Sequence, residues 1–204
     1  MPIYVKSGSY TLGESFVAGG GVYTKTDASN LRLWTRLRNS PVDQSGNSIT
    51  VSYTGSPTFS SQKIPNSQKS RSLDLSVATF DGTSDNAAAA ATSHLDFSGD
   101  VPFSVACWVN KPNNGASAVV FAMPNVAGSA SGWSVLVSGT GSVAMALKGT
   151  GGGKATATTE PNVFPEGEWV HLVATYNGSK TGSGISIYIN GKKIATEDDS
   201  SGTF

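Results

Sequence analysis

The sequence has only one cysteine and few charged residues. It holds a single cysteine among 204 residues, so no internal disulfide can form and a buried core must supply the stability. Only 14% of the residues are charged, and the formal net charge is zero. Nucleic acid and anionic lipid are bound by clustered Lys and Arg, so this composition argues against both as partners.

Long apolar runs are missing as well. None approaches the roughly 20 residues of a membrane-spanning helix. Residues 1–6 lack the basic head and apolar stretch of a secretory signal peptide. We therefore expect a soluble protein that is made in a cytoplasm and does not bind a membrane.

Strong helix formers are also scarce. Leu, Glu and Lys are few, and the 24 glycines exceed an average share of about 7%. The one Ala-rich run, 87–91, is barely longer than a helical turn, so we expect strand or loop there. Elsewhere short apolar, β-branched and aromatic runs alternate with clusters of Gly, Asn, Asp, Pro and Ser. This alternation predicts an all-β protein, an antiparallel sandwich or barrel.

The composition changes near residue 30. Residues 1–30 are polar and Gly-rich and are predicted to form an extended N-terminal arm for assembly, while 31–204 form the folded domain. Within the domain, 31–37 alternates like a half-buried strand, 54–72 is predicted to be a long polar connection, and 73–80 resumes the alternation. The second half predicts further strands at 103–110, 118–123, 133–137, 143–147, 155–159, 169–176 and 185–189.

A hairpin near the end of the chain gives the sharpest local signal. The alternating run 185–189 is followed by Asn190-Gly191 and then by 192–195. Asn and Gly tolerate the positive φ values of a two-residue turn. We therefore predict two antiparallel strands joined at Asn190-Gly191.

Several short motifs occur in an order and spacing that is shared with a known family. They are Phe80-Asp81-Gly82, Leu95-Asp96-Phe97, 103–109, Gly132-Trp133-Ser134, 169–176 and 187–192. On these motifs, over about residues 30–195, the chain resembles the laminin-G-like, concanavalin-A-like jelly-roll superfamily. The resemblance implies a two-sheet antiparallel jelly-roll sandwich. Many members bind glycans or proteins, some with calcium, although a fold alone does not fix a function.

One departure from the family concerns the end of the sequence. The family usually continues after the Asn-Gly hairpin with another strand and a closing strand beside the first one, whereas this chain stops at Thr203-Phe204. We therefore expect a sandwich that lacks its last strands. Either the chain is a fragment of a longer product, or a neighbouring subunit supplies the missing strand at the open edge.

Paired acids for sugar hydrolysis are missing from the predicted strands. Retaining glycosidases place two carboxylates roughly 5 Å apart at the sugar. The nearest match, Glu166-Gly167-Glu168, falls in a predicted turn, and 197–199 is expected to be a solvated loop, with a cation site as the alternative. The Gly-rich run 149–153 lacks the Gly-Lys-Ser/Thr ending of a phosphate loop and is predicted to be a hairpin loop. We therefore predict no enzyme activity.

Metal-binding residues are sparse in the sequence. Asp81 and Asp85 are the calcium candidates, because turns there offer hard oxygen donors, but Asp also favours turns for backbone reasons. His94 and His171 lie far apart, and no second cysteine marks a zinc set. His171 is expected to pack within its strand and Cys107 to be a small buried hydrophobe. We predict no cofactor, with calcium as the alternative.

Aromatic rings are the candidate glycan contacts, because their faces offer apolar area to sugar rings. Trp108 and Trp169 belong to the family's core pattern and are expected in the core. The remaining candidates for sugar stacking are Trp34, Trp133, Tyr176 and Tyr188.

Two functions fit these features. The first is a non-enzymatic structural protein of a bacteriophage virion, a homo-oligomeric capsid decoration or fibre component that contacts other virion subunits through its arm. This fold usually occurs in secreted, surface-displayed proteins, yet the chain has neither a signal peptide nor disulfides. That combination suits a phage protein that folds in the host cytoplasm and is released when the host cell lyses. The second is a carbohydrate-binding module for host-receptor adhesion, which binds cell-surface glycans, or one that is attached to a glycan-active enzyme.

Overall fold

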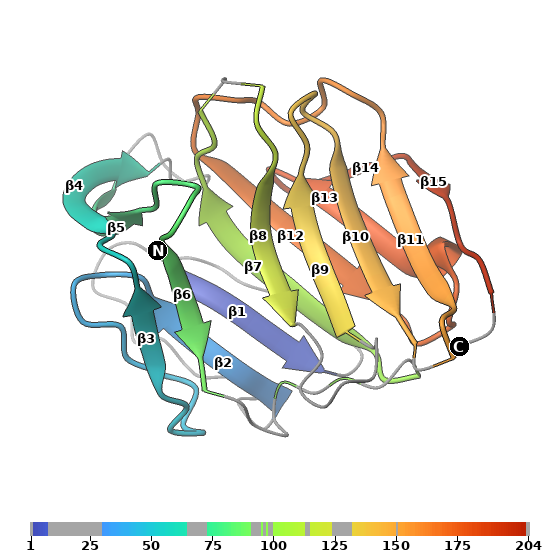
Figure 1. Cartoon of the computed structure of the whole chain (residues 1–204), viewed down its shortest axis with the longest axis horizontal. Coiled ribbons are helices and arrows are strands. Elements are labelled where there is room, and N and C mark those ends of the chain that lie inside the picture. Colours follow the sequence, from blue (N-terminus) through green and yellow to red (C-terminus); the bar gives the residue numbers. More distant parts are fainter. Residues whose placement is uncertain are drawn as a thin grey trace.

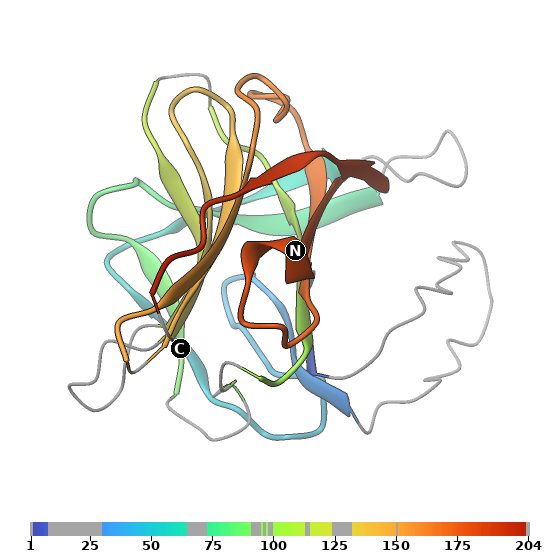
Figure 2. The same cartoon turned by 90° about the vertical axis from the view of Figure 1, so that its right-hand side faces the viewer.

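The computed structural model describes residues 2–7, 30–64, 73–90, 95, 97, 100–112, 115–123, 132–149 and 151–202. In this part of the chain the regular structure is almost entirely β, as the sequence predicts, and the short 3-10 helix η2 (Gly182–Gly184) precedes β13. Two antiparallel sheets lie face to face, and smaller strand pairs stand at one end (Figures 1 and 2). No helix in the described ranges is both long and apolar enough to span a membrane.

The two large sheets form the layers of the sandwich. The first has the order β14 (Lys192–Ile194), β13 (Ile185–Ile189), β12 (Val170–Tyr176), β7 (Phe103–Val109), β1 (Pro2–Ser7) and β2 (Leu31–Arg36). The second has the order β15 (Thr196–Asp198), β11 (Lys154–Thr159), β10 (Val143–Lys148), β9 (Gly132–Val137) and β8 (Ala118–Met123). Two further pairs join β3 (Val51–Thr54) to β6 (Asn86–Ala89), and β4 (Thr58–Ile64) to β5 (Leu73–Thr79).

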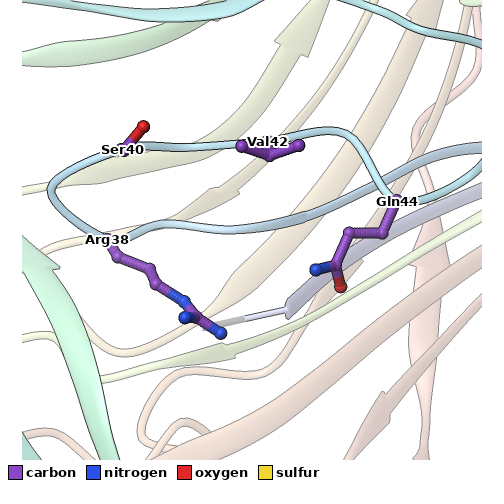
Figure 3. A pocket seen from close by; sticks show the side chains of 4 residues that line it. All are labelled: Arg38, Ser40, Val42 and Gln44. Carbon is purple, nitrogen blue, oxygen red and sulfur yellow. The ribbon is translucent and has the colours of Figure 1, made fainter.

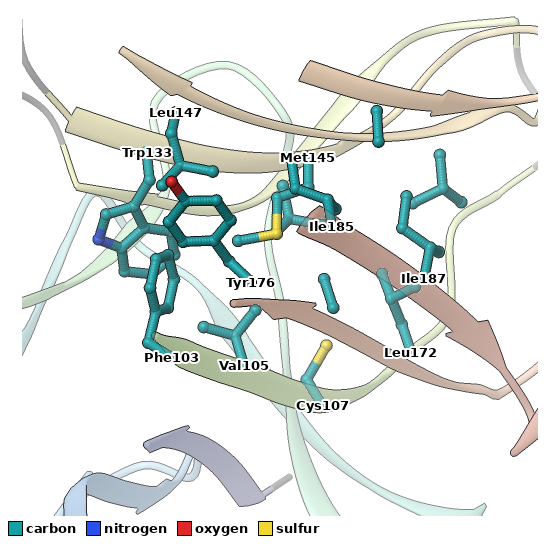
Figure 4. Packing of buried hydrophobic residues seen from close by; sticks show 14 of the residues in the cluster. Phe103, Val105, Cys107, Trp133, Met145, Leu147, Leu172, Tyr176, Ile185 and Ile187 are labelled. Atoms are coloured by element: carbon teal, nitrogen blue, oxygen red, sulfur yellow. The ribbon is translucent and has the colours of Figure 1, made fainter. Parts of the chain in front are cut away.

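Strand alternation builds the core between the layers. Along β7, Phe103, Val105 and Cys107 are each 1% exposed, while the residues between them lie on the other face. β9 and β10 alternate in the same way, so the inner faces of both sheets interlock (Figure 4). The rings of Phe97 and Phe103 stack with centroids 4.5 Å apart. This buried apolar surface is the main source of stability in a chain whose one cysteine is a free, buried thiol.

The predicted hairpin is confirmed. β13 and β14 pair antiparallel with Ile189 opposite Lys192, and the two turn residues both have positive φ, 51° at Asn190 and 82° at Gly191. These are the backbone angles that Asn and Gly tolerate best. The Asn190 side chain also accepts the backbone N–H of His171 at 2.9 Å, which ties the turn to β12.

The Ala-rich and Gly-rich runs form the predicted structures. Residues 86–89 form strand β6, not a helix. The run 149–153 joins β10 to β11, where the Gly149 N–H donates to the Gly153 carbonyl at 2.8 Å. The Ala-rich run is too short to form a stable helix by itself.

Two predictions about the first half were wrong. The segment predicted to be a polar connection contains β4, which pairs with β5 from Thr58 opposite Thr79 to Ile64 opposite Leu73. Its polar composition hid it, because Phe59 and Ile64 are the only apolar residues in the sequence of β4. The N-terminal arm also contributes to the folded domain: residues 2–7 form β1, which lies between β2 and β7. Residues 8–29 of the predicted arm lie outside the described residues.

Candidate functional site

The aromatic glycan candidates do not gather at one site. Trp133 and Tyr176 are 7% and 3% exposed, and both pack against Phe103, with ring centroids 5.0 and 6.0 Å from it (Figure 4). The Tyr176 hydroxyl also accepts the backbone N–H of Lys180 at 2.6 Å. Their ring faces belong to the core, so the prediction that these two rings stack on a sugar was wrong.

Trp34 and Tyr188 lie on the outer face of the six-stranded sheet, opposite the core. Trp34 is on β2 and Tyr188 on β13, and three strands separate these two. At a strand spacing of about 4.8 Å, the two rings stand roughly 19 Å apart across the sheet. One sugar ring therefore cannot contact both, although each ring remains a candidate by itself.

The same outer face holds a tryptophan that the sequence interpretation placed in the core. Trp108 is only partly buried, and its ring lies 5.2 Å from that of His171, directly opposite on β12. Burial lowers the pKa of His171 below its ordinary value. His171 is thus packed within its strand, as predicted. The other predicted histidine, His94, lies outside the described residues.

A pocket lies at the end of the sandwich where the pairs β3–β6 and β4–β5 stand, which we call the hairpin end. It brings together groups of the kind that bind sugars. Its volume is about 370 Å³, and it lies between the β3–β4 turn, the adjoining ends of β4 and β5, and the loop 80–85. We call it the Phe80 pocket; its lining residues are Gly55, Ser56, Thr58, Thr79, Phe80, Asp81, Ser84 and Asp85. Residues with hydroxyl, carboxylate and aromatic side chains therefore line one hollow.

Two carboxylates hold the loops of the Phe80 pocket in place. One oxygen of Asp81 accepts the backbone N–H groups of Thr83, Ser84 and Asp85 at 2.8, 2.8 and 2.9 Å. These backbone hydrogen bonds, that of Thr83 foremost, hold the pKa of Asp81 well below its usual range. Asp85 in turn accepts the backbone N–H of Ser56 at 2.7 Å and so joins the two loops.

An aromatic group supports the pocket from the side. Tyr53 packs against Phe59 and Phe80, with ring centroids 5.3 and 6.3 Å away. Its hydroxyl donates to the Arg38 carbonyl at 2.6 Å, and burial raises the pKa of Tyr53 to about 12. Phe80 itself is partly exposed at the pocket. Sequence reasoning named Phe80 only as part of a family motif and did not identify it as a residue that lines a pocket.

The calcium candidates Asp81 and Asp85 do lie together in this pocket, but their carboxylates accept hydrogen bonds from the backbone. Within the described ranges, no three His, Cys, Asp or Glu side chains gather in a way that could hold a metal ion. Asp81 and Asp85 thus form a pair of turn-stabilising carboxylates, and a cation bound there would compete with these N–H donors.

Three of the remaining acidic candidates hold parts of the scaffold together. Glu166 forms an ion pair with Lys111, which is 3% exposed. Asp198 accepts the backbone N–H groups of Ser183 and Ser200 at 2.8 and 2.9 Å, and Asp199 pairs with Lys154 at 2.8 Å. The contacts of Glu166 with Lys111, of Asp198 with Ser183 and of Asp199 with Lys154 join segments that lie apart in the sequence.

A second, smaller pocket lies beneath the loop that follows β2. It measures about 80 Å³ and is lined by Arg38, Ser40, Val42 and Gln44 (Figure 3). The Arg38 and Gln44 side chains extend to the same side of the loop. The lining has no aromatic ring and no carboxylate, so it offers less to a sugar than the Phe80 pocket does.

Comparison with known proteins places the fold in a family. The model of the concanavalin A-like lectin/glucanases superfamily matches residues 81–204, more than half of the chain. The chain belongs to this family. No curated protein matches the chain.

Proposed function

We propose that the chain is a non-enzymatic carbohydrate-binding module that holds a sugar in the Phe80 pocket. The observation that carries this proposal is the meeting, in one hollow, of a partly exposed aromatic ring with hydroxyls and a pair of carboxylates. The family, which is one of lectins and glucanases, supports the same class of ligand.

The Phe80 pocket offers a sugar two kinds of contact. The Phe80 ring presents apolar area to the C–H face of a pyranose. The second oxygen of Asp81 accepts the Ser84 hydroxyl at 2.8 Å and still has a lone pair for a sugar hydroxyl. Ser56 and Thr58 add two hydroxyl-bearing residues to the lining. The ligand that fits is a neutral sugar, because carboxylates in the lining repel an anionic one.

A glycan array with the full chain tests the proposal. We expect saturable binding to neutral glycans, and the Phe80→Ala variant should weaken it by about tenfold, or about 1.4 kcal/mol. Tyr188→Ala is the matched control, because this ring is also partly exposed but lies on the six-stranded sheet. If no glycan on the array is bound, the proposed carbohydrate binding is contradicted. If binding is lost in Tyr188→Ala and kept in Phe80→Ala, the Phe80 pocket is not the binding site.

The proposed binding needs neither metal nor catalysis. One Asp81 oxygen and both Asp85 oxygens accept backbone N–H groups, and the other Asp81 oxygen accepts the Ser84 hydroxyl, so a chelator should leave the glycan signal unchanged. Incubation with a bound oligosaccharide should release no shorter sugars. A chelator-sensitive signal would show that calcium completes the site, and release of products would show that the chain is an enzyme.

A structural role at a phage surface is a second candidate. The observation that favours it is the outer face of the five-stranded sheet, where small, mostly uncharged side chains follow one another from strand to strand: Ser134, Leu136, Ala144, Ala146, Thr156 and Thr158. Such a face suits contact with another protein subunit. Mass spectrometry of purified particles of a phage that encodes this chain tests the idea. The peptides of the chain should be recovered with the particles; their presence only in the lysate supernatant contradicts it.

A further inference from the structure

Most of the arginines in the chain occur in one short stretch. Three of the four, Arg32, Arg36 and Arg38, lie in or just after β2, and no acidic residue occurs between Asp27 and Asp43. The Asp43 carboxylate accepts backbone N–H groups of its own loop and of β2. In a chain whose formal net charge is zero, positive charge is therefore concentrated at this place.

Arg38 is the charged residue of the small pocket beneath the loop after β2, which we call the Arg38 pocket. Its volume is about 80 Å³, and its lining contains no carboxylate. Among the described residues, no Asp or Glu forms an ion pair with Arg38. The guanidinium of Arg38 and the amide of Gln44 extend to the same side of the loop (Figure 3). A guanidinium presents its N–H donors in a planar fork that matches a carboxylate, so the Arg38 pocket suits this group.

Tyr53 connects the Arg38 pocket to the Phe80 pocket. Its hydroxyl donates to the Arg38 carbonyl at 2.6 Å, and its ring centroid lies 6.3 Å from that of Phe80. One partly exposed tyrosine thus contacts a lining residue of each pocket. Both pockets lie at the hairpin end of the sandwich, beside β3 (Figure 1). A short oligosaccharide is long enough to reach from one pocket to the other.

The two pockets have opposite charges. Asp81 and Asp85 line the Phe80 pocket without a Lys or Arg, whereas Arg38 is the one charged residue in the lining of the other pocket. A carboxylate on a ligand is therefore repelled from the first pocket and attracted to the second. An oligosaccharide with neutral and acidic residues would bind in one register, with a neutral residue beside Phe80 and an acidic residue beside Arg38.

We propose that the Arg38 pocket binds the carboxylate of a uronic acid that belongs to the same glycan as the neutral sugar in the Phe80 pocket. The Arg38 guanidinium donates to the carboxylate oxygens, and the Gln44 amide is placed to donate to them as well. This inference rests on the proposed function, because it extends the ligand of the Phe80 pocket and makes an acidic oligosaccharide the preferred class.

Calorimetric titration of the full 204-residue chain tests the proposal. The probes are the uronic-acid-containing glycans of the array, each compared with its carboxyl-reduced form, in which the acid is a primary alcohol. The wild type should bind at least one acidic glycan about tenfold more tightly than its reduced form, because reduction removes charge-assisted hydrogen bonds. Arg38→Gln should abolish this preference and leave the affinity for the reduced form unchanged.

Two further variants serve as controls. Lys148→Gln removes the same charge from an exposed residue that lines neither pocket, and it should retain the preference for the acidic form. Phe80→Ala should weaken the binding of the acidic and the reduced forms by the same factor of about ten, because both forms place a neutral sugar in the Phe80 pocket.

The outcomes distinguish this inference from the proposed function. Equal wild-type affinities for the acidic and reduced forms overturn the inference and leave the function in place. A preference that Arg38→Gln retains, or that Lys148→Gln also loses, overturns it too. If Phe80→Ala leaves the affinity for the acidic glycan unchanged, the two pockets do not share one ligand and the inference fails. If no glycan is bound in either form, the function and the inference fail together.

Discussion

The strands in the interior of the sandwich and those at its hairpin end differ in how deeply they bury their side chains. In the interior, β7 and β9 bury every second side chain, and Phe103 and Val135 are almost fully inaccessible. At the hairpin end, β3 and β6 alternate only between partly buried and exposed residues. The strands of the core have no side chains free for a ligand on their inner faces. The groups that we propose for sugar binding therefore lie where the chain leaves the sandwich, around the Phe80 pocket.

Replacing an aromatic ring in each region should give the largest contrast. Phe103→Ala removes a ring that contacts Phe97, Trp133 and Tyr176, and should lower the free energy of unfolding by about 3–5 kcal/mol. Phe80→Ala removes a partly exposed ring and should cost about 1 kcal/mol. Urea denaturation followed by circular dichroism measures both. Equal losses would show that the hairpin end belongs to the core.

The ion pair of Lys111 and Glu166 should come next in size. Lys111→Ala leaves the Glu166 carboxylate, 13% exposed, without its partner and should cost about 3 kcal/mol. The double variant Lys111→Met/Glu166→Leu removes both charges and should recover most of this loss. The same denaturation measurement applies. A double variant as unstable as the single one would mean that packing, not charge, explains the loss.

Two glycines with positive φ allow the free-energy cost of backbone strain to be distinguished from an effect on glycan binding. Gly191, in the β13–β14 turn, has φ 82°, and Gly82, in the loop of the Phe80 pocket, has φ 74°; an added Cβ would meet no atom within 4 Å at either site. Alanine at either position should therefore cost about 1 kcal/mol through backbone strain alone. Only Gly82→Ala should also change glycan affinity. Equal glycan affinities of the Gly82→Ala and Gly191→Ala variants would show that the loop of the Phe80 pocket takes no part in binding.

The smallest effect concerns acid pH. The pKa of Asp81 is lower in the folded chain than in the unfolded chain, so the folded state binds fewer protons in acid. The stability that Asp81 contributes is present above about pH 4 and is lost as the pH falls. The difference in stability between wild type and Asp81→Asn should therefore shrink on acidification. Glu160→Gln, at an exposed position, is the control, and a difference that does not change with pH would contradict this assignment.

The sandwich was predictable because its strands follow a period of two and its turns use Asn-Gly chemistry. The same period held information about the tryptophans. Trp133 shares a strand face with Val135 and Val137, which indicates burial, whereas Trp108 shares one with Ser104 and Ala106, which indicates the outer face. Assigning these rings by family pattern and by their general suitability for sugar stacking overlooked this alternation.

The Phe80 pocket was not predictable from the sequence. Its walls come from residues 55–58 and 79–85, which meet only because β3 pairs with β6 and β4 with β5. Alternation at 73–80 indicated β5, but the other strands of these pairs are rich in Ser, Thr and Ala, so hydrophobic periodicity does not reveal how the strands pair. The same holds for β1, because a polar, Gly-rich neighbourhood gives no indication that residues 2–7 enter the middle of a sheet.

The fluorescence of the Trp133 side chain can report on the packing of the interior. Its indole N–H is buried and has no hydrogen-bond partner in the described structure, and its ring lies among Phe97 and Phe103. An indole in such dry surroundings emits at shorter wavelength than one in water. Loosening of the contact between the two layers will therefore shift the emission to the red, and fluorescence can follow the opening of the sandwich without any added dye.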